Sequence, residues 1–523
     1  MSLNPRYKNN ASNAFSDQNI LNAWRDAEVA VLRAKASAEP DNSEFEAAAR
    51  ALSAIGDVNV ARKEEIEKET KHDLVAAIRA MSEQVDAQNP GKNYGRLIHQ
   101  GITSYDTEDT AQSLLLTAAG KDMQKSLWKL SDALMQKAKT FKYAPCNGYT
   151  HSQIAEPITI GKRFLDAAVG IDEQSSRFAY EIDQINQCKI KGATGIYSGS
   201  LSPQFETMVA AILEQSVSKT ATQILPIEDM LNFFHPFPVI ASKVQNLAYS
   251  LCLSSGDLAE VKEGFAKGQT GSSVMTFKQN PINLENVIGA ARKIKGLYSE
   301  LMDATLTLRE RDISNSFQVV RHIIPELFET MEHLAKKMTS VVNGMGVFPI
   351  QALRNINKYG DFVYAGAAKD FIATNFSGGD NKEIYSLVQK YSMESKFSSD
   401  YRGEAISLAD ALAPKVREIG GDEKVAQLKA VMSLPYNLRN VSGAYNVALN
   451  DPQTDNHNAI ADYIIESGQM EQFKQADSWN WIKTYAGIVR ANYDNSGAEK
   501  AEYSNLDDAM QKISFALQNT RTR

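Results

Sequence analysis

The chain has 523 residues, of which 43% are hydrophobic and 23% are charged, and its formal net charge is −7. This composition excludes collagen-like and low-complexity proteins, and the acidic balance argues against a surface that coats nucleic acid. The length corresponds to about three or four domains, and with only 15 prolines long helices can run without interruption.

Four long amphipathic helices are predicted, because apolar residues recur at alternating steps of three and four along one helical face. These faces lie between residues 107 and 141 and over 160–185, 284–308 and 327–345. Pro157 and Pro325 precede the second and fourth faces, and proline is favoured in a first helical turn. The helices are two to three times longer than the average of about a dozen residues, so we expect a bundle that oligomerises through them.

The pattern predicts an all-α protein, since no segment shows a regular alternation of period two. We expect three segments: an N-terminal helical domain (1–105), a central long-helix bundle (106–355) and a C-terminal helical domain with a divergent tail (356–523). The stretch 373–402 loosens the helical pattern and is interpreted as a boundary. Trp479 and Trp481, in the shorter helical pieces that follow, are expected to be buried.

The sequence also predicts a location. Its first residues lack the apolar stretch of a secretory signal, and it has no run of about 18 uncharged apolar residues that could span a bilayer. The 3 cysteines, Cys146, Cys188 and Cys252, are widely spaced. They fit neither a disulfide framework nor a zinc site and favour a reducing compartment. We therefore expect a cytoplasmic protein without membrane or nucleic-acid partners.

Histidines in the polar segments between helices are candidate functional residues, because the chain has only 7 of them. His72, His99 and His151 lie in compact polar motifs. His151 stands among hydroxyl and amide residues shortly before Pro157, and polar groups at a helix N-terminus can bind an anionic substrate. The alternative is that the neighbouring threonine and serine only cap the helix and form a turn.

The segment 262–283, the signature loop, carries the most specific pattern. Its glycines make it flexible, and Ser272, Ser273, Lys278 and Asn280 bring two hydroxyls, a cation and an amide together directly before a long helix. Such a loop suits a lid that closes over a charged substrate, although Gly- and Ser-rich loops also occur as plain connections. It lacks the spacing of a Walker phosphate loop and of a nucleophile elbow.

Seven segments stand out along the chain: PRY at 5–7, KHDLVAA, GITSYDTEDTA, GYTHSQ, GATGIYSG, GSSVMTFKQNP and ERDISNS at 310–316. In residues and in order they resemble the fumarase/aspartase superfamily. The superfamily's hallmark loop GSSxMPxKxNP stands here as GSSVMTFKQNP, with Thr276 in place of proline. Within the superfamily they are most similar to the lyases that release fumarate from succinyl nucleotides.

The resemblance implies a β-elimination. A base removes a proton from the carbon next to one carboxylate, and the C–N bond then breaks while an acid protonates the leaving nitrogen. The carbanion is tolerable only if the adjacent carboxylate takes up its charge, so donors preorganised around that carboxylate should matter most.

The resemblance also implies catalytic roles. Ser272 would be the general base, activated by loop closure and exclusion of water, with Ser273 as the alternative. Lys278 and Asn280 would stabilise the dianionic intermediate. His151 would be the general acid. Glu285 would orient the imidazole of that histidine. His72 would lie near the phosphate or the leaving group.

Substrate-binding residues are implied in the same way. Thr103, Ser104 and Gln153 would hold the succinyl carboxylates. The remaining implied contacts, mostly to the nucleotide, are Arg6, Tyr7, Asp73, Gln223, Arg311 and Ser316. Arginine and tyrosine suit a phosphate because of charge and donor geometry.

Two departures from the superfamily pattern concern the nucleotide. An arginine is expected nine residues after Arg311, but Val320 stands there and Arg321 follows. A slip of one residue turns a helical side chain by about 100°, so either a local bulge restores the arginine or the phosphate contact differs. Glu228 also stands where an arginine is common.

The resemblance implies a homotetramer in which each active site gathers motifs from three chains, and catalysis that needs no metal or organic cofactor. Two alternatives remain open. One is another fumarate-releasing member, such as a lyase for argininosuccinate. The other is a non-catalytic helical scaffold, against which the intact Ser272, Lys278, Asn280 and His151 count. The PRY and ERDISNS segments favour a nucleotide substrate.

Overall fold

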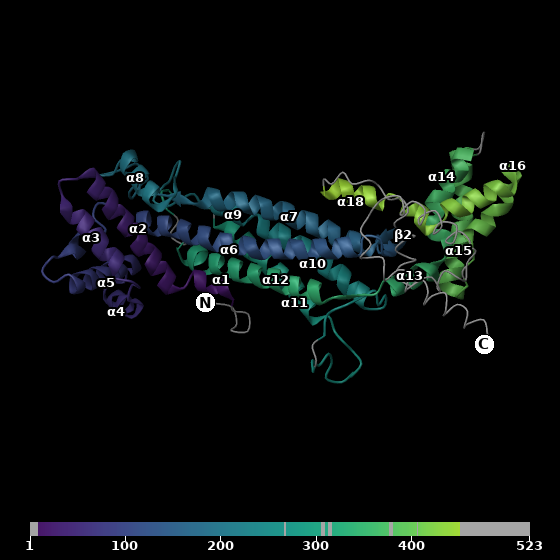
Figure 1. Cartoon of the computed structure of the whole chain (residues 1–523), viewed down its shortest axis with the longest axis horizontal. Helices are drawn as coiled ribbons and strands as arrows, with labels where there is room; N and C mark the ends of the chain where they lie inside the picture. Colours follow the sequence, from purple (N-terminus) through teal and green to yellow (C-terminus); the bar gives the residue numbers. More distant parts are fainter. Residues whose placement is uncertain are drawn as a thin grey trace, which may run out of the picture. The chain divides into compact units, whose positions relative to one another are not determined.

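The computed structural model describes residues 9–449 except 266–267, 305–308, 312–315, 376–379 and 405. Helices dominate this part of the chain (Figure 1), which confirms the predicted all-α class. Before the signature loop the helices are α1 (Asn10–Ala14), α2 (Asp17–Ala38), α3 (Ser43–Ala54), α4 (Val60–Thr70), α5 (Asp73–Gln88), η2 (Tyr94–Leu97), α6 (Ser104–Thr140), α7 (Ile160–Ile185), α8 (Pro203–Leu213), α9 (Ile227–Phe234) and α10 (Pro236–Ser255).

After that loop the helices are α11 (Ile282–Asp303), η3 (Ser316–Ile323), α12 (Ile324–Gly344), α13 (Pro349–Tyr359), η4 (Asp361–Tyr364), α14 (Ala365–Asn375), α15 (Asn381–Phe397), η5 (Ser398–Arg402), α16 (Leu408–Val431), α17 (Leu434–Asn437) and α18 (Val441–Leu449). Among them η3 and η5 are π-helices, and η4 is a 3₁₀ helix. No helix of the described residues has both the length and the apolar character that crossing a membrane requires.

The four predicted long helices are confirmed as α6, α7, α11 and α12. Their apolar stripes are buried, as Leu127 on α6, Phe164 on α7 and Met331 on α12 illustrate, each with 0% of its surface exposed. Helix α11 ends at Asp303, whereas the predicted face continued to Leu308, which lies outside the described residues.

The chain forms two compact units. The first unit comprises the residues up to Asp132, Gly170–Tyr249 and Ile282–Val341, and the second comprises Ala133–Val169, Ser250–Pro281 and the residues from Val342 onward. The unit boundaries fall inside α6, α7, α10 and α12, because each of these long helices contributes residues to both. The three sequence segments expected above stay a proposal.

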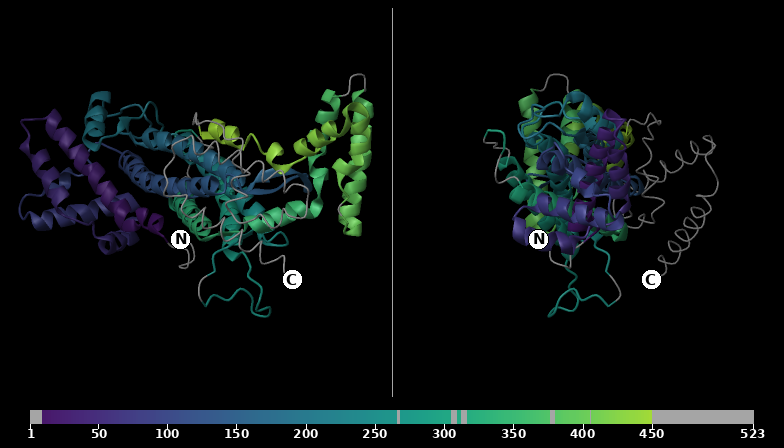
Figure 2. Two further views of the ribbon diagram at one scale, coloured as in Figure 1. Left: turned by 45° about the vertical axis from the view of Figure 1, so that its right-hand side comes forward. Right: turned by 90° about the vertical axis from the view of Figure 1, so that its left-hand side faces the viewer.

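The first unit contains a bundle of long helices joined by an aromatic core. In it α6, α7, α10, α11 and α12, labelled in Figure 1, lie side by side there and in the turned views of Figure 2. Polar contacts such as that between His333 Nε2 and Asn286 Oδ1, 2.6 Å, link neighbouring helices. Phe178 and Phe233 have ring centroids 5.1 Å apart, and Phe328 of α12 packs edge-on against the ring of Phe234 in α9, with centroids 5.4 Å apart. Burial of such rings supplies much of the driving force for helix association.

The second unit contains a β-hairpin that the sequence did not predict. Strands β1 (Pro145–Thr150) and β2 (Gln153–Thr159) pair antiparallel, with a register shift between Asn147 and Tyr149. Pro157 therefore lies in β2 opposite Asn147, and the prediction that it begins a helix was wrong; α7 begins at Ile160. Proline is tolerated because both strands are edges of a two-stranded sheet.

The remaining strands are two-residue pairs. They are β3 (Gln187–Cys188) parallel to β4 (Ser216–Val217), and β5 (Val261–Lys262) antiparallel to β6 (Gly346–Val347).

The C-terminal part of the second unit has its own core, to which α13–α17 contribute buried leucine, isoleucine and valine side chains. Helix α15 and the π-helix η5 occupy most of the stretch 373–402, so its loose pattern marks helix rather than a structureless connection. Trp479 and Trp481, predicted to be buried, lie outside the described residues.

Candidate active site

The N-terminus of α6 presents two of the residues implied to hold carboxylates. Thr103 and Ser104 are half-buried there. The Thr103 N–H donates to Asp106 Oδ2 at 3.0 Å, and the Asp106 N–H donates to the Thr103 carbonyl at 2.9 Å. The first of these bonds is one half of a capping box, and the second is the backbone bond of the first turn; together they fix the start of the helix. The exposed N–H groups and dipole of such a helix end favour an anionic group.

Arg311 and Gln223 lie together beside this helix end. The Arg311 guanidinium stacks on the ring of Tyr105, 4.3 Å from its centroid, and its Nη2 donates to the tyrosine hydroxyl at 3.0 Å. Its Nη1 donates to Gln223 Oε1 at 3.4 Å. The structure thus brings together Arg311, which the resemblance assigned to the nucleotide phosphate, and Gln223, which it assigned to the substrate. The resemblance did not indicate a role for Tyr105, although this residue directly follows Thr103 and Ser104 in the segment GITSYDTEDTA.

His72 and Asp73 begin α5. His72 is the N-cap, and its Nδ1 accepts from the Val75 N–H at 3.4 Å. Asp73 forms an ion pair with Arg321. The π-helix η3, which spans Val320 and Arg321, is a local bulge of the kind that one of the two alternatives required. That Arg321 contacts phosphate stays a prediction.

Two further carboxyls accompany these arginines. Burial, together with the carboxylates of Asp73 and Asp109, raises the pKa of Glu108 to about 8, although Arg311 and Arg321 act in the opposite direction. Burial also raises the pKa of Asp109 to about 7, and the main opposing influence is Lys189. Sequence reasoning missed both carboxyls. The available signal was their place on α6, three and four residues after Tyr105, which puts all three on one helical face.

This cluster predicts a dependence of stability on pH. The pKa of Glu108 rises from 4.5 in the unfolded chain to about 8, so the folded chain binds this proton more tightly. The stability that this bound proton contributes to the folded chain is fully present below pH 4.5 and is lost as the pH rises through about 8. In Glu108→Gln we expect the free energy of unfolding to fall less over this range, with a residual slope from Asp109. Urea unfolding at a series of pH values measures this, and identical profiles for the two proteins would contradict it.

In the second unit His151 lies in the turn of the hairpin. His151 and Ser152 both have positive φ, 50° and 59°, and connect β1 to β2. His151 and Gln153 are exposed. The expectation that His151 stands at a helix N-terminus was wrong, because strand β2 separates it from α7. An exposed imidazole at a hairpin turn is free to meet a substrate from outside the hairpin.

The signature loop is held together by its own polar groups. Ser272 Oγ accepts from the N–H groups of Val274 and Met275 at 3.4 and 3.0 Å. Asn280 Nδ2 donates to the Gly271 carbonyl at 3.1 Å, so the two ends of the motif are joined. A Cβ at Gly271 would lie only 2.2 Å from the carbonyl oxygen of Lys278, which explains the glycine at this position.

The other predicted residues of this region lie as follows. The side chains of Ser273 and Lys278 are exposed on the loop, and Glu285 is exposed in the first turn of α11. Glu285 belongs to the first unit and His151 to the second, and their predicted interaction stays a prediction. Arg6, Tyr7 and the side chain of Ser316 lie outside what the structure describes. Among the described residues no group of three or more His, Cys, Asp or Glu side chains is arranged to hold a metal ion.

A protein-family model described as a lyase matches residues 4–296. The adenylosuccinate lyase of Staphylococcus saprophyticus is 31% identical over 385 residues, which cover 73% of this chain and 86% of that protein. The adenylosuccinate lyase of Bacillus subtilis is 32% identical over 381 residues, which cover 73% of this chain and 85% of that protein.

Solved structures share the fold. A fumarate lyase from Mesorhizobium superimposes with a TM-score of 0.73 at 18% identity, over 86% of this chain and 100% of that one. The 3-carboxy-cis,cis-muconate lactonizing enzyme from Pseudomonas putida does so with a TM-score of 0.72 at 20% identity, over 86% and 97%. These likenesses confirm the predicted fold, and the sequence matches confirm the predicted family: the chain belongs to the adenylosuccinate lyase family of the fumarase/aspartase superfamily.

Proposed function

We propose that the protein is an adenylosuccinate lyase, which releases fumarate from adenylosuccinate to give AMP and from the related succinyl-carboxamide ribotide SAICAR to give AICAR. The observation that carries this proposal beyond family membership is the cluster at the start of α6. There Arg311 contacts Tyr105 and Gln223 beside Thr103 and Ser104. A cation for the nucleotide phosphate thus stands next to a helix end for a carboxylate, as a succinyl nucleotide requires.

In the proposed reaction Ser272, on the closing loop, removes the proton from the carbon next to one carboxylate. The electron pair moves into that carboxylate, where Lys278 and Asn280 stabilise the charge. The pair then forms the double bond of fumarate as the C–N bond breaks, and the imidazolium of His151 protonates the leaving nitrogen. Loop closure matters because a serine hydroxyl becomes an effective base only when water is excluded and cations lie near.

We further propose that four chains associate and that each site is completed by residues from neighbouring chains. The exposure of His151, Lys278 and Glu285 within one chain supports this, since catalytic side chains need partners. The long helices also expose large apolar side chains, among them Tyr180 on α7 at 62% and Leu253 on α10 at 74%. Such surface is typical of subunit contacts. Sedimentation analysis tests the assembly. A cytoplasmic location is also proposed, because no disulfide joins Cys146, Cys188 or Cys252 in the described part of the chain.

The proposed function is tested by incubating the protein with adenylosuccinate, SAICAR and argininosuccinate in separate reactions. We expect fumarate from the two succinyl nucleotides and none from argininosuccinate, because the cluster on α6 combines phosphate and carboxylate recognition. Release from argininosuccinate alone would replace the proposal with the related lyase activity. No fumarate from any of the three, by an intact tetramer, would favour the scaffold alternative.

A further inference from the structure

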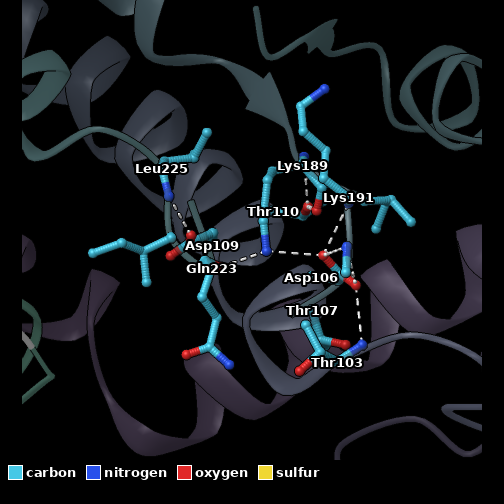
Figure 3. A network of polar contacts seen from close by, with 12 residues as sticks. Thr103, Asp106, Thr107, Asp109, Thr110, Lys189, Lys191, Gln223 and Leu225 are labelled. Atoms are coloured by element: carbon cyan, nitrogen blue, oxygen red, sulfur yellow. Dashed lines mark hydrogen bonds and ion pairs between the residues drawn. The ribbon is translucent and has the colours of Figure 1, made fainter. Parts of the chain in front are cut away.

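A lysine inside the first unit connects two parts of the candidate site. Lys189 and Asp106 are both 0% exposed, and Lys189 Nζ lies 2.9 Å from Asp106 Oδ1. The same ammonium group donates to the carbonyl oxygen of Gln223 at 2.5 Å. Figure 3 shows the Lys189 side chain reaching between Asp106 and Gln223. A charge buried this fully is costly unless it is paired and hydrogen-bonded, so these contacts determine where the side chain lies.

On one side of Lys189, Asp106 controls the start of α6. Its carboxylate accepts from the backbone N–H groups of Thr103, Lys191 and Gly192 at 3.0 to 3.2 Å. Asp106 therefore joins the segment of Thr103 and Ser104 to the GATG segment that follows Lys191. Asp106 is fully buried and acts on Thr103 through the backbone.

On the other side of Lys189, Gln223 leads to the nucleotide cluster. The Gln223 N–H donates to the Glu310 carbonyl at 3.1 Å, and its side chain accepts from Arg311. The chain before α9 forms no regular structure at this point. The bond from Lys189 therefore holds a segment that helix or sheet hydrogen bonds do not hold.

We propose that Lys189 is a positioning residue for the lyase reaction. It fixes the distance between Gln223 and the Thr103–Ser104 segment, so that one substrate molecule can contact both. This inference rests on the proposed function, because it assigns a substrate contact to Gln223 and a carboxylate contact to Thr103 and Ser104. Lys189 itself is buried behind these residues and does not touch the substrate. Small displacements of binding groups are costly to an enzyme, on the order of a hundredfold per ångström.

The decisive variant is Lys189→Met, which removes the charge and the donors but keeps a long unbranched side chain. Asp106 retains three backbone N–H donors in this variant, which favours folding. We expect the KM for adenylosuccinate to rise on the order of tenfold or more, with a smaller change in kcat measured per folded tetramer. Lys189→Arg, which keeps charge and donors, should restore most of the affinity.

Lys191→Met is the matched control. Lys191 is as deeply buried, at 3% exposure, and pairs with Glu206 at 2.7 Å, but its side chain points away from Gln223 (Figure 3). A variant that only weakens the fold lowers the amount of active enzyme and leaves KM unchanged. We expect that result for Lys191→Met. If Lys189→Met behaves in the same way, with unchanged KM, the positioning role is refuted.

A double variant tests the route through Gln223. If Lys189 acts in part by holding Gln223, the KM increases of Lys189→Met and Gln223→Ala should combine to less than their product, and fully independent effects would overturn the proposal. Should Lys189→Met not fold, Lys189→Gln takes its place with the same expected direction. Wild-type turnover is measured first: absence of fumarate there defeats the proposed function, whereas normal wild-type turnover with unchanged KM in the Lys189 variants defeats only this inference.

Discussion

Ser272→Ala is expected to lower kcat by about 10²- to 10⁴-fold, the range that a general base contributes. The substitution removes the only hydroxyl oxygen that could accept the proton at this position. Its structural cost should be small, because the bonds that Ser272 Oγ makes to described residues are the two it accepts from the N–H groups of Val274 and Met275, on a loop whose side chains are mostly exposed. Circular dichroism and sedimentation should therefore match the wild type, while fumarate release measures the loss.

Ser273→Ala is the matched control, since Ser273 is the adjacent hydroxyl of the same loop and the alternative base. We expect it to retain most of its turnover. The opposite pattern, with Ser273→Ala inactive and Ser272→Ala active, would transfer the role of base to Ser273. Equally small decreases of kcat in both variants would show that neither serine of this loop is the general base.

Glu260→Ala is expected to lower the free energy of unfolding by about 3–5 kcal/mol, as breaking a buried ion pair does. Glu260 is 0% exposed; its Oε2 lies 3.3 Å from Arg163 Nη1, and its Oε1 accepts from Asn355 at 3.0 Å. Arg163 also donates to the Asn147 carbonyl at 2.8 Å. The substitution thus leaves a nearly buried guanidinium without its carboxylate beside the hairpin that carries His151.

Denaturant unfolding of the whole protein measures this change. Asp122→Ala is the control, because its partner Lys125 and Asp122 itself are mostly exposed, at 66% and 78%, and surface pairs contribute little. We expect its unfolding midpoint to match the wild type. A Glu260→Ala protein as stable as the Asp122→Ala protein would show that water already solvates Arg163.

The long helices were predictable because the apolar residues of an amphipathic helix recur in the sequence with the period of the helix. The apolar residues of α6, α7, α11 and α12 recur at steps of three and four, and those positions are buried. The hairpin of β1 and β2 was not predictable in the same way. Its residues show no alternation of period two, and Pro157 gave a helix signal that pairing with Asn147 overrode.

The candidate site divides along the same line. The motifs identified Thr103, Gln223 and Arg311 as candidate site residues in separate parts of the sequence. The structure brings Gln223 and Arg311 into contact. The motifs did not indicate Lys189 or Glu108, because neither lysine nor glutamate reveals from the sequence whether it is buried. Lys189 is fully buried, and burial is the main cause of the raised pKa of Glu108, so the importance of both depends on the packed structure.

By itself, the sequence determined the helical class, the superfamily and the residues that resemble its catalytic set. These features could be predicted because helical periodicity depends only on neighbouring residues and because a motif is recognised from its residue order, without knowledge of long-range contacts. Only the tertiary structure decided that a buried lysine joins Asp106 to Gln223, that a π-helix lies at Arg321 and that His151 stands at a hairpin turn. These features depend on contacts between residues far apart in the chain, and on the desolvation that raises the pKa of Glu108 to about 8.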